Sequence, residues 1–142
     1  MNRIVVPNDI LLGEASRMLS EGRDVIIMTK GSSMLPFIRG ERDSVLLRRK
    51  KSVEVGDIVL VRLSDGRYVL HRVFEVSGER VVLMGDGNIQ GKELCTSGDV
   101  VGTVIEIIRD GSRHVTPGKG RIWRLLLPVR RYLLYIYRHV IL

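Results

Sequence analysis

The sequence predicts a mainly β domain, folded as a small barrel or coiled sheet, with one helix before it and one helix after it. Short runs rich in valine, isoleucine and leucine alternate with turn residues, as they do in all-β domains. The connections Ser64–Gly66 and Ser77–Glu79 have the composition of hairpin turns. The chain has 142 residues, of which 44% are hydrophobic and 27% charged, and this suits a single domain with a sizeable core.

The predicted elements follow one another along the chain. Residues 9–21 carry apolar side chains at helical spacing, so we expect a short helix that Gly22 ends. The expected strands are residues 24–29, 44–48, 57–63, 67–76, 80–84 and 100–108.

The chain is expected to divide into four units. Residues 112–120 contain serine, threonine, proline and two glycines, which is typical of a linker. The predicted units are an N-terminal helical segment (1–22), a β domain (23–111), this linker (112–120) and a basic helical tail (121–142).

The positive charge is concentrated at the end of the chain. The formal net charge is +7, and residues 119–142 hold six Lys/Arg and no acid. The rest of the chain carries 17 basic and 16 acidic side chains, and is therefore nearly neutral. This distribution argues against nucleic acid as a partner of the β domain.

The tail has an amphipathic pattern of its own. Its expected apolar side is made by Ile122, Leu126, Val129, Leu133, Ile136 and Val140, and Arg124, Arg131 and Arg138 recur on the opposite side. Pro128 is expected to kink or divide the helix. Such a helix suits a membrane interface near anionic lipid. It equally suits packing on the protein's own core or on a second copy of the chain.

The sequence shows neither a secretory signal nor an apolar stretch long enough to span a membrane. Its one cysteine, Cys95, cannot form an internal disulfide. We therefore expect a protein that is cytoplasmic or peripheral at the inner face of the membrane. One cysteine and scattered histidines give no metal-ligand spacing, and no cofactor or metal is implied.

Two side chains suggest nucleophilic chemistry. Ser33 stands in the turn-like run Gly31–Pro36, and His71 stands in the strand-like run Tyr68–Val73. Serine needs an adjacent base to accept its proton, and a neutral histidine suits that task. In a strand His71 would share a face with Val69 and Val73, where partial desolvation keeps the ring neutral.

The residues around this pair resemble type I signal peptidases and the related LexA-like peptidases. Ser33–Pro36 is similar to the Ser-Met-x-Pro box, residues 70–73 to the general-base box, and Gly85–Asn88 to the Gly-Asp-Asn box. Residues 40–43, 55–59 and 99–102 are similar to further segments of the family, so that the resemblance covers roughly residues 23–108. The base is a lysine in most bacterial members, but a histidine in the endoplasmic-reticulum type, as here.

The resemblance implies a serine endopeptidase acting on an extended leader-like or signal-like peptide, with small residues before the cut. Ser33 would be the nucleophile and His71 the base, and the Ser33 backbone N–H and the Ser32 hydroxyl would bind the oxyanion. The implied substrate-binding residues are Met34, Pro36 and Val69.

The chain departs from the pattern in three places. Many members have an oxyanion-binding serine two residues before the nucleophile, whereas here Gly31 stands there, with Ser32 beside it. The chain also lacks the membrane-spanning helix that usually precedes the nucleophile, and Lys92 falls about where the histidine type has an orienting aspartate. Asp86 is therefore the expected orienting acid. A peptide-binding module with weak or no activity and a LexA-like regulator that cleaves itself stay open as alternatives.

Overall fold

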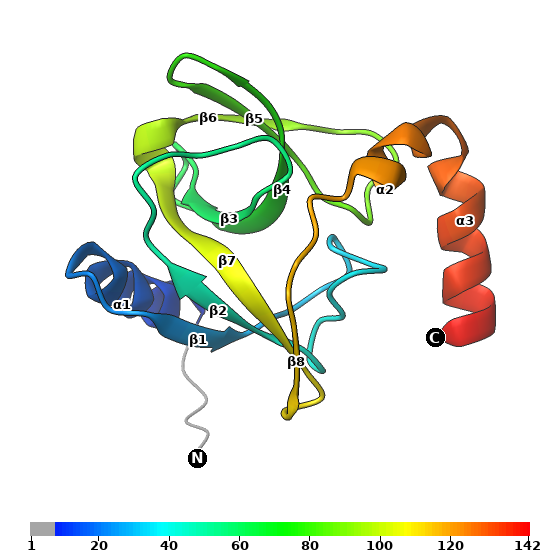
Figure 1. The fold of residues 1–142 in the computed structure, drawn as a ribbon, viewed down its shortest axis with the longest axis horizontal. Helices are drawn as coiled ribbons and strands as arrows, with labels where there is room; N and C mark the ends of the chain where they lie inside the picture. The colour runs from blue at the N-terminus through cyan, green and yellow to red at the C-terminus, as the bar shows by residue number, and fades with distance from the viewer. Residues whose placement is uncertain (1–7) are drawn as a thin grey trace.

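The computed structural model describes residues 8–142, and its centre is one curled, eight-stranded antiparallel sheet (Figure 1). Helix α1 (Asn8–Ser20) precedes the sheet. The strands are β1 (Val25–Met28), β2 (Ser44–Arg48), β3 (Ile58–Arg62), β4 (Tyr68–Ser77), β5 (Arg80–Met84), β6 (Glu93–Thr96), β7 (Val100–Arg109) and β8 (Arg113–Val115). A 3-10 turn, η1 (Ser97–Asp99), links β6 to β7. The predicted mainly β fold is confirmed.

The strand order is β1-β2-β7-β3-β4-β5-β6, and β8 pairs with β7. The hairpins β3–β4 and β4–β5 form where the turn residues predict them. Two strands were not predicted. β6 has only four residues and one buried side chain, Cys95, and β8 lies within the segment expected to be a linker. Such short strands form mainly because a neighbouring strand offers hydrogen bonds, and a sequence pattern of this length carries little signal.

Apolar side chains on both faces of the curled sheet are buried, and they form two separate core clusters. Alternate residues of β3 show this: Ile58 and Leu60 pack with α1 in one cluster, and Val59 and Val61 pack in the other. A helix on one side and the inward curl on the other thus keep β3 buried along most of its length.

The C-terminal part is helical but divided. It consists of α2 (Arg121–Leu125), the 3-10 turn η2 (Leu127–Val129), α3 (Arg130–Ile136) and the π-helical turn η3 (Tyr137–Ile141). The break falls at Pro128, which has no N–H for a helical hydrogen bond. In Figure 1 these helices lie on the other side of the sheet from α1. Among residues 8–142, no helix combines the length and the apolar character that a bilayer crossing requires.

Candidate active site

The loop that carries Ser33 follows β1 and is fixed at its base by Asp43. The carbonyl of Asp43 accepts hydrogen bonds from the Thr29 hydroxyl (2.7 Å) and the Thr29 N–H (3.0 Å). Its carboxylate accepts from the Arg39 N–H (2.8 Å) and from the Arg42 guanidinium (2.7 Å). Burial alone would raise the pKa of Asp43, but these hydrogen bonds outweigh it and the pKa lies below its usual range. A buried, ionised carboxylate therefore ties the two ends of the loop together.

The tip of this loop rests on the turn Gly85–Asn88. The Gly87 N–H donates to the Ser33 carbonyl at 2.7 Å. A Cβ added to Gly87 would lie 2.2 Å from the Ser32 carbonyl oxygen, and one added to Gly85 would lie 2.4 Å from that of Ser33. The two glycines are thus required by the close approach of two backbones. The turn thus supports the serine loop through backbone contacts and not through its side chains.

His71 is buried in β4, and its Nδ1 atom faces the Oε1 atom of Glu93 in β6. Both atoms are buried, and apart from each other neither has a hydrogen-bond partner among the described residues. The strand register explains the pairing. Leu83 of β5 lies opposite Val73 of β4 on one side and opposite Glu93 on the other, so the three share a face. His71 is two residues before Val73 and therefore points to that face as well.

Asp86, the expected orienting acid, lies elsewhere. Its carboxylate accepts from Nε (2.9 Å) and Nη2 (2.8 Å) of Arg72, and both side chains are buried. Arg72 points to the opposite face of β4 from His71, and its Nη1 donates to the carbonyls of Gly56 and Gly118. The Asp86 carbonyl accepts from the indole N–H of Trp123 at 2.8 Å. Asp86 therefore joins the sheet to the C-terminal helices and, in the described part of the chain, shares no ion pair with His71.

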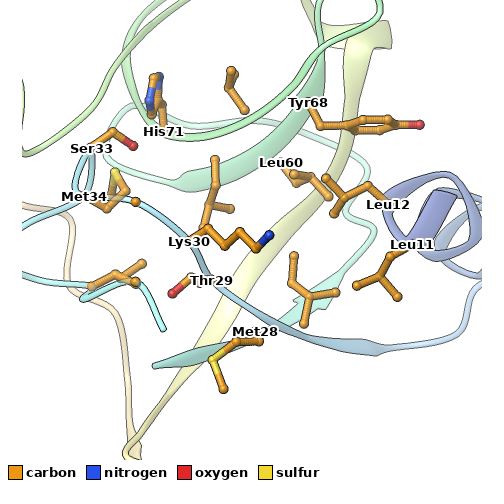
Figure 2. A pocket seen from close by; sticks show the side chains of 16 residues that line it. Leu11, Leu12, Met28, Thr29, Lys30, Ser33, Met34, Leu60, Tyr68 and His71 are labelled. Carbon is orange, nitrogen blue, oxygen red and sulfur yellow. The ribbon is translucent and has the colours of Figure 1, made fainter. Parts of the chain in front are cut away.

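Ser33 and His71 line one pocket of about 210 Å³ (Figure 2). An added Cβ on Gly85 would lie 3.2 Å from the His71 ring, which places this glycine between the ring and the Ser33 carbonyl. No hydrogen bond joins the side chains of Ser33 and His71 among the described residues. Catalytic hydrogen bonds of a free enzyme are often long and tighten only when substrate is bound.

The pocket lies between two stretches of unpaired strand edge. β1 is an edge strand of the sheet. The half of β4 from Tyr68 to His71 pairs with β3 on one side, whereas its pairing with β5 begins only at Arg72. Both stretches line the pocket, together with Leu11 and Leu12 of α1. An extended peptide between them would find backbone donors and acceptors on both sides.

Comparison with protein families decides the relationship. The model of the Peptidase S24-like family matches residues 4–105, which is more than two thirds of the chain. The chain belongs to the Peptidase S24-like family. This family is part of the LexA and signal-peptidase superfamily, so the resemblance seen in the sequence is confirmed at that level. A comparison with curated proteins finds no match.

The S24-like match spans the serine loop and β4, which line the pocket, and the Gly85–Asn88 turn on which the loop rests. Of the predicted substrate-binding residues, Val69 and Met34 line the pocket, and Met34 is also part of the core cluster beside α1. Pro36 and Ser32 are not among the residues that line it. The contribution of α1 and the presence of Lys30 in the pocket, seen in Figure 2, were not predicted. The helix itself was predicted, but nothing in its sequence indicated that it lines the pocket, because any helix packed on a core has an apolar side.

Proposed function

We propose that this S24-like chain is a serine endopeptidase in which Ser33 is the nucleophile, His71 the general base and Glu93 the carboxylate that orients the base. The contact between Glu93 and His71 supports this proposal most strongly, because it occupies Nδ1 of a ring that lines the same pocket as Ser33, so that Nε2 is the nitrogen left for the serine. Glu93 takes the role first expected of Asp86. It follows Lys92 directly, and Lys92 instead lies over the Phe74 ring.

In the proposed reaction His71 carries its proton on Nδ1, and this N–H donates a hydrogen bond to the Glu93 carboxylate, which stays ionised. Nε2 is then an acceptor and takes the proton of the Ser33 hydroxyl as Oγ attacks the scissile carbonyl. The Ser33 backbone N–H and the Ser32 hydroxyl stabilise the oxyanion. When the carbonyl re-forms, Nε2–H protonates the leaving amine. Water then attacks the acyl-enzyme by the same route and releases Ser33.

The proposed substrate is an extended leader-like or signal-like peptide that lies between β1 and the first half of β4. The apolar lining from Leu11, Leu12 and Tyr68 favours aliphatic side chains in the pocket. The amine of Lys30 reaches into the same space, so an acidic group on the peptide would gain an ion pair there (Figure 2).

The proposed protein is of the histidine-base type within the superfamily. Its proposed location is the cytoplasm or the inner face of the membrane. A fluorophosphonate probe tests it without knowledge of the substrate, because the probe forms a covalent bond with an activated serine. Labelling is expected in the wild type, to be absent in Ser33→Ala and to be at least about 10²-fold slower in His71→Gln. Ser52→Ala, an exposed serine away from the pocket, should label like the wild type.

The second candidate is a peptide-binding module that keeps the pocket without efficient chemistry. The missing hydrogen bond between Ser33 and His71 favours it. A wild-type chain that folds but reacts no faster with the probe than Ser33→Ala would refute the peptidase proposal and leave this candidate. A self-cleaving regulator would instead show shorter fragments of the chain that Ser33→Ala abolishes.

A further inference from the structure

The C-terminal helices have two apolar sides, and only one of them is packed. Trp123 and Leu134 are buried with Leu35 of the serine loop, and Phe37, Leu126 and Tyr137 pack around them. The other side faces solvent. It consists of Ile122, Leu125, Val129, Leu133, Ile136 and Val140, with exposed fractions of 74, 79, 43, 36, 53 and 75%. These six residues are called the tail face below. The last four are spaced at four, three and four residues, so they form one stripe from the end of η2 along α3 and η3.

Most of the positive charge of the tail has no acidic partner: among the described residues only Lys119 pairs with carboxylates, those of Glu54 and Asp57. Residues 119–142 contain six Lys/Arg and no Asp/Glu. In the described part of the chain, neither Arg121 nor Arg131 forms an ion pair with a carboxylate, and both are exposed. Tyr132 and Tyr135, each 64% exposed, stand beside the stripe. Tyrosine rings with an apolar body and a polar tip are typical of the boundary between lipid and water.

We propose that the tail face docks on the surface of a bilayer containing anionic lipid. An apolar stripe lying in the interface removes exposed apolar area from water, and free arginines beside it are attracted to negative headgroups. A second copy of the chain suits this surface less well. A symmetric dimer through the same patch would bring the unneutralised cations of both chains together.

Docking of the tail face would also fix the position of the pocket. The packed side of the same helices holds Leu35 and Phe37, which follow Ser33 in its loop. The serine loop would then lie about one helix diameter, roughly 10 Å, from the lipid surface. The docking itself does not depend on the proposed peptidase reaction, and it is therefore measured with Ser33→Ala as well as with the wild type.

Truncation of the tail is a poor test because Trp123 and Leu134 belong to the core. Two surface variants of the full chain avoid this difficulty. Ile136→Ser/Val140→Ser removes part of the tail face. Its matched control, Ile26→Ser/Leu94→Ser, removes two apolar side chains of the sheet that are also more than half exposed. Both should unfold at the temperature of the wild type.

The measurement is co-sedimentation with vesicles of phosphatidylcholine alone and of phosphatidylcholine with phosphatidylglycerol. Binding is expected only to the anionic vesicles, about 10-fold weaker in Ile136→Ser/Val140→Ser and unchanged in the control. Arg121→Gln/Arg131→Gln should weaken binding and flatten its decline with salt, because fewer charges are then screened. Arg49→Gln/Lys51→Gln removes the same amount of charge from an exposed loop. This control should change neither the binding nor its dependence on salt.

Several results would overturn the proposal. One is no sedimentation with anionic vesicles, and another is an equal loss of binding in the tail-face variant and its control. A third result would come from sedimentation velocity without lipid, which measures whether the chain is a monomer or a dimer. A dimer that Ile136→Ser/Val140→Ser converts to a monomer would assign the tail face to a contact between copies. Retention of wild-type binding by Arg121→Gln/Arg131→Gln at every salt concentration would exclude an anionic surface as the partner.

Discussion

Glu93→Gln is expected to slow the reaction of Ser33 with a fluorophosphonate by about 10² to 10⁴-fold, the range that positioned acid–base groups contribute. The structure gives the reason. His71 Nδ1 and Glu93 Oε1 are buried and have no other polar partner among the described residues. The glutamine amide can donate to Nδ1, which would place the ring's proton on Nε2, where it blocks acceptance from Ser33. The upper end of the range corresponds to about 5.5 kcal/mol of barrier height.

The exposure of Glu93 sets where in this range the result should fall. Its side chain is 22% exposed, whereas that of His71 is 9% exposed, so water can reach the carboxylate more easily than the ring. A water molecule can partly replace the lost acceptor, and we expect a loss nearer about 10³-fold than 10⁴-fold. Glu93→Asp keeps the charge and should lose less than Glu93→Gln.

The chain offers a matched control for this variant. Glu106 Oε1 lies 2.6 Å from His114 Nδ1 in a similar but more exposed pair away from the pocket. Glu106→Gln therefore removes the same kind of contact and should leave the labelling rate unchanged. Wild-type labelling by Glu93→Gln at every pH from 5 to 9 would show that Glu93 does not orient the base. Equal slowing by both variants would point to a general loss of structure.

Two further predictions concern the packing of the sheet. Gly87→Ala places a Cβ 2.2 Å from the Ser32 carbonyl, so it should lower the unfolding temperature and slow labelling of Ser33, by overpacking that costs about 1–3 kcal/mol. Gly98→Ala, whose Cβ meets nothing closer than 3.7 Å, should do neither, and wild-type behaviour of Gly87→Ala would contradict the seating of the loop on this turn. Burial raises the pKa of the Cys95 thiol to about 11, so the native protein should resist alkylation at pH 8, where only about 10⁻³ of the thiol is ionised. Because the unfolded thiol ionises at lower pH, the stability of the wild type relative to Cys95→Ala should fall between about pH 9 and 11, and a pH-independent difference would refute the raised pKa.

The sequence was sufficient to predict the main strands and the mainly β fold. Alternating apolar residues and turn composition are local properties, and β1, β2, β3, β4, β5 and β7 were found in this way. Ser33 and His71 were singled out because the segments around them resemble the boxes of type I signal peptidases; a serine and a histidine alone would be weak evidence. The family match agrees with that interpretation at the level of the superfamily.

The sequence by itself determined which residue types and which local segments this protein has, but tertiary structure decided which of them meet. Glu93 reaches His71 only because β5 holds β4 and β6 in one register, while Asp86 is drawn to Arg72 on the opposite face. The tail shows the same division. Its helical pattern and one apolar side were predicted from the sequence. Packing of Trp123 and Leu134 against Leu35 decided which side is buried. Pairing between distant segments depends on strand register and on competition for buried surface, and neither is a property of a short stretch of sequence.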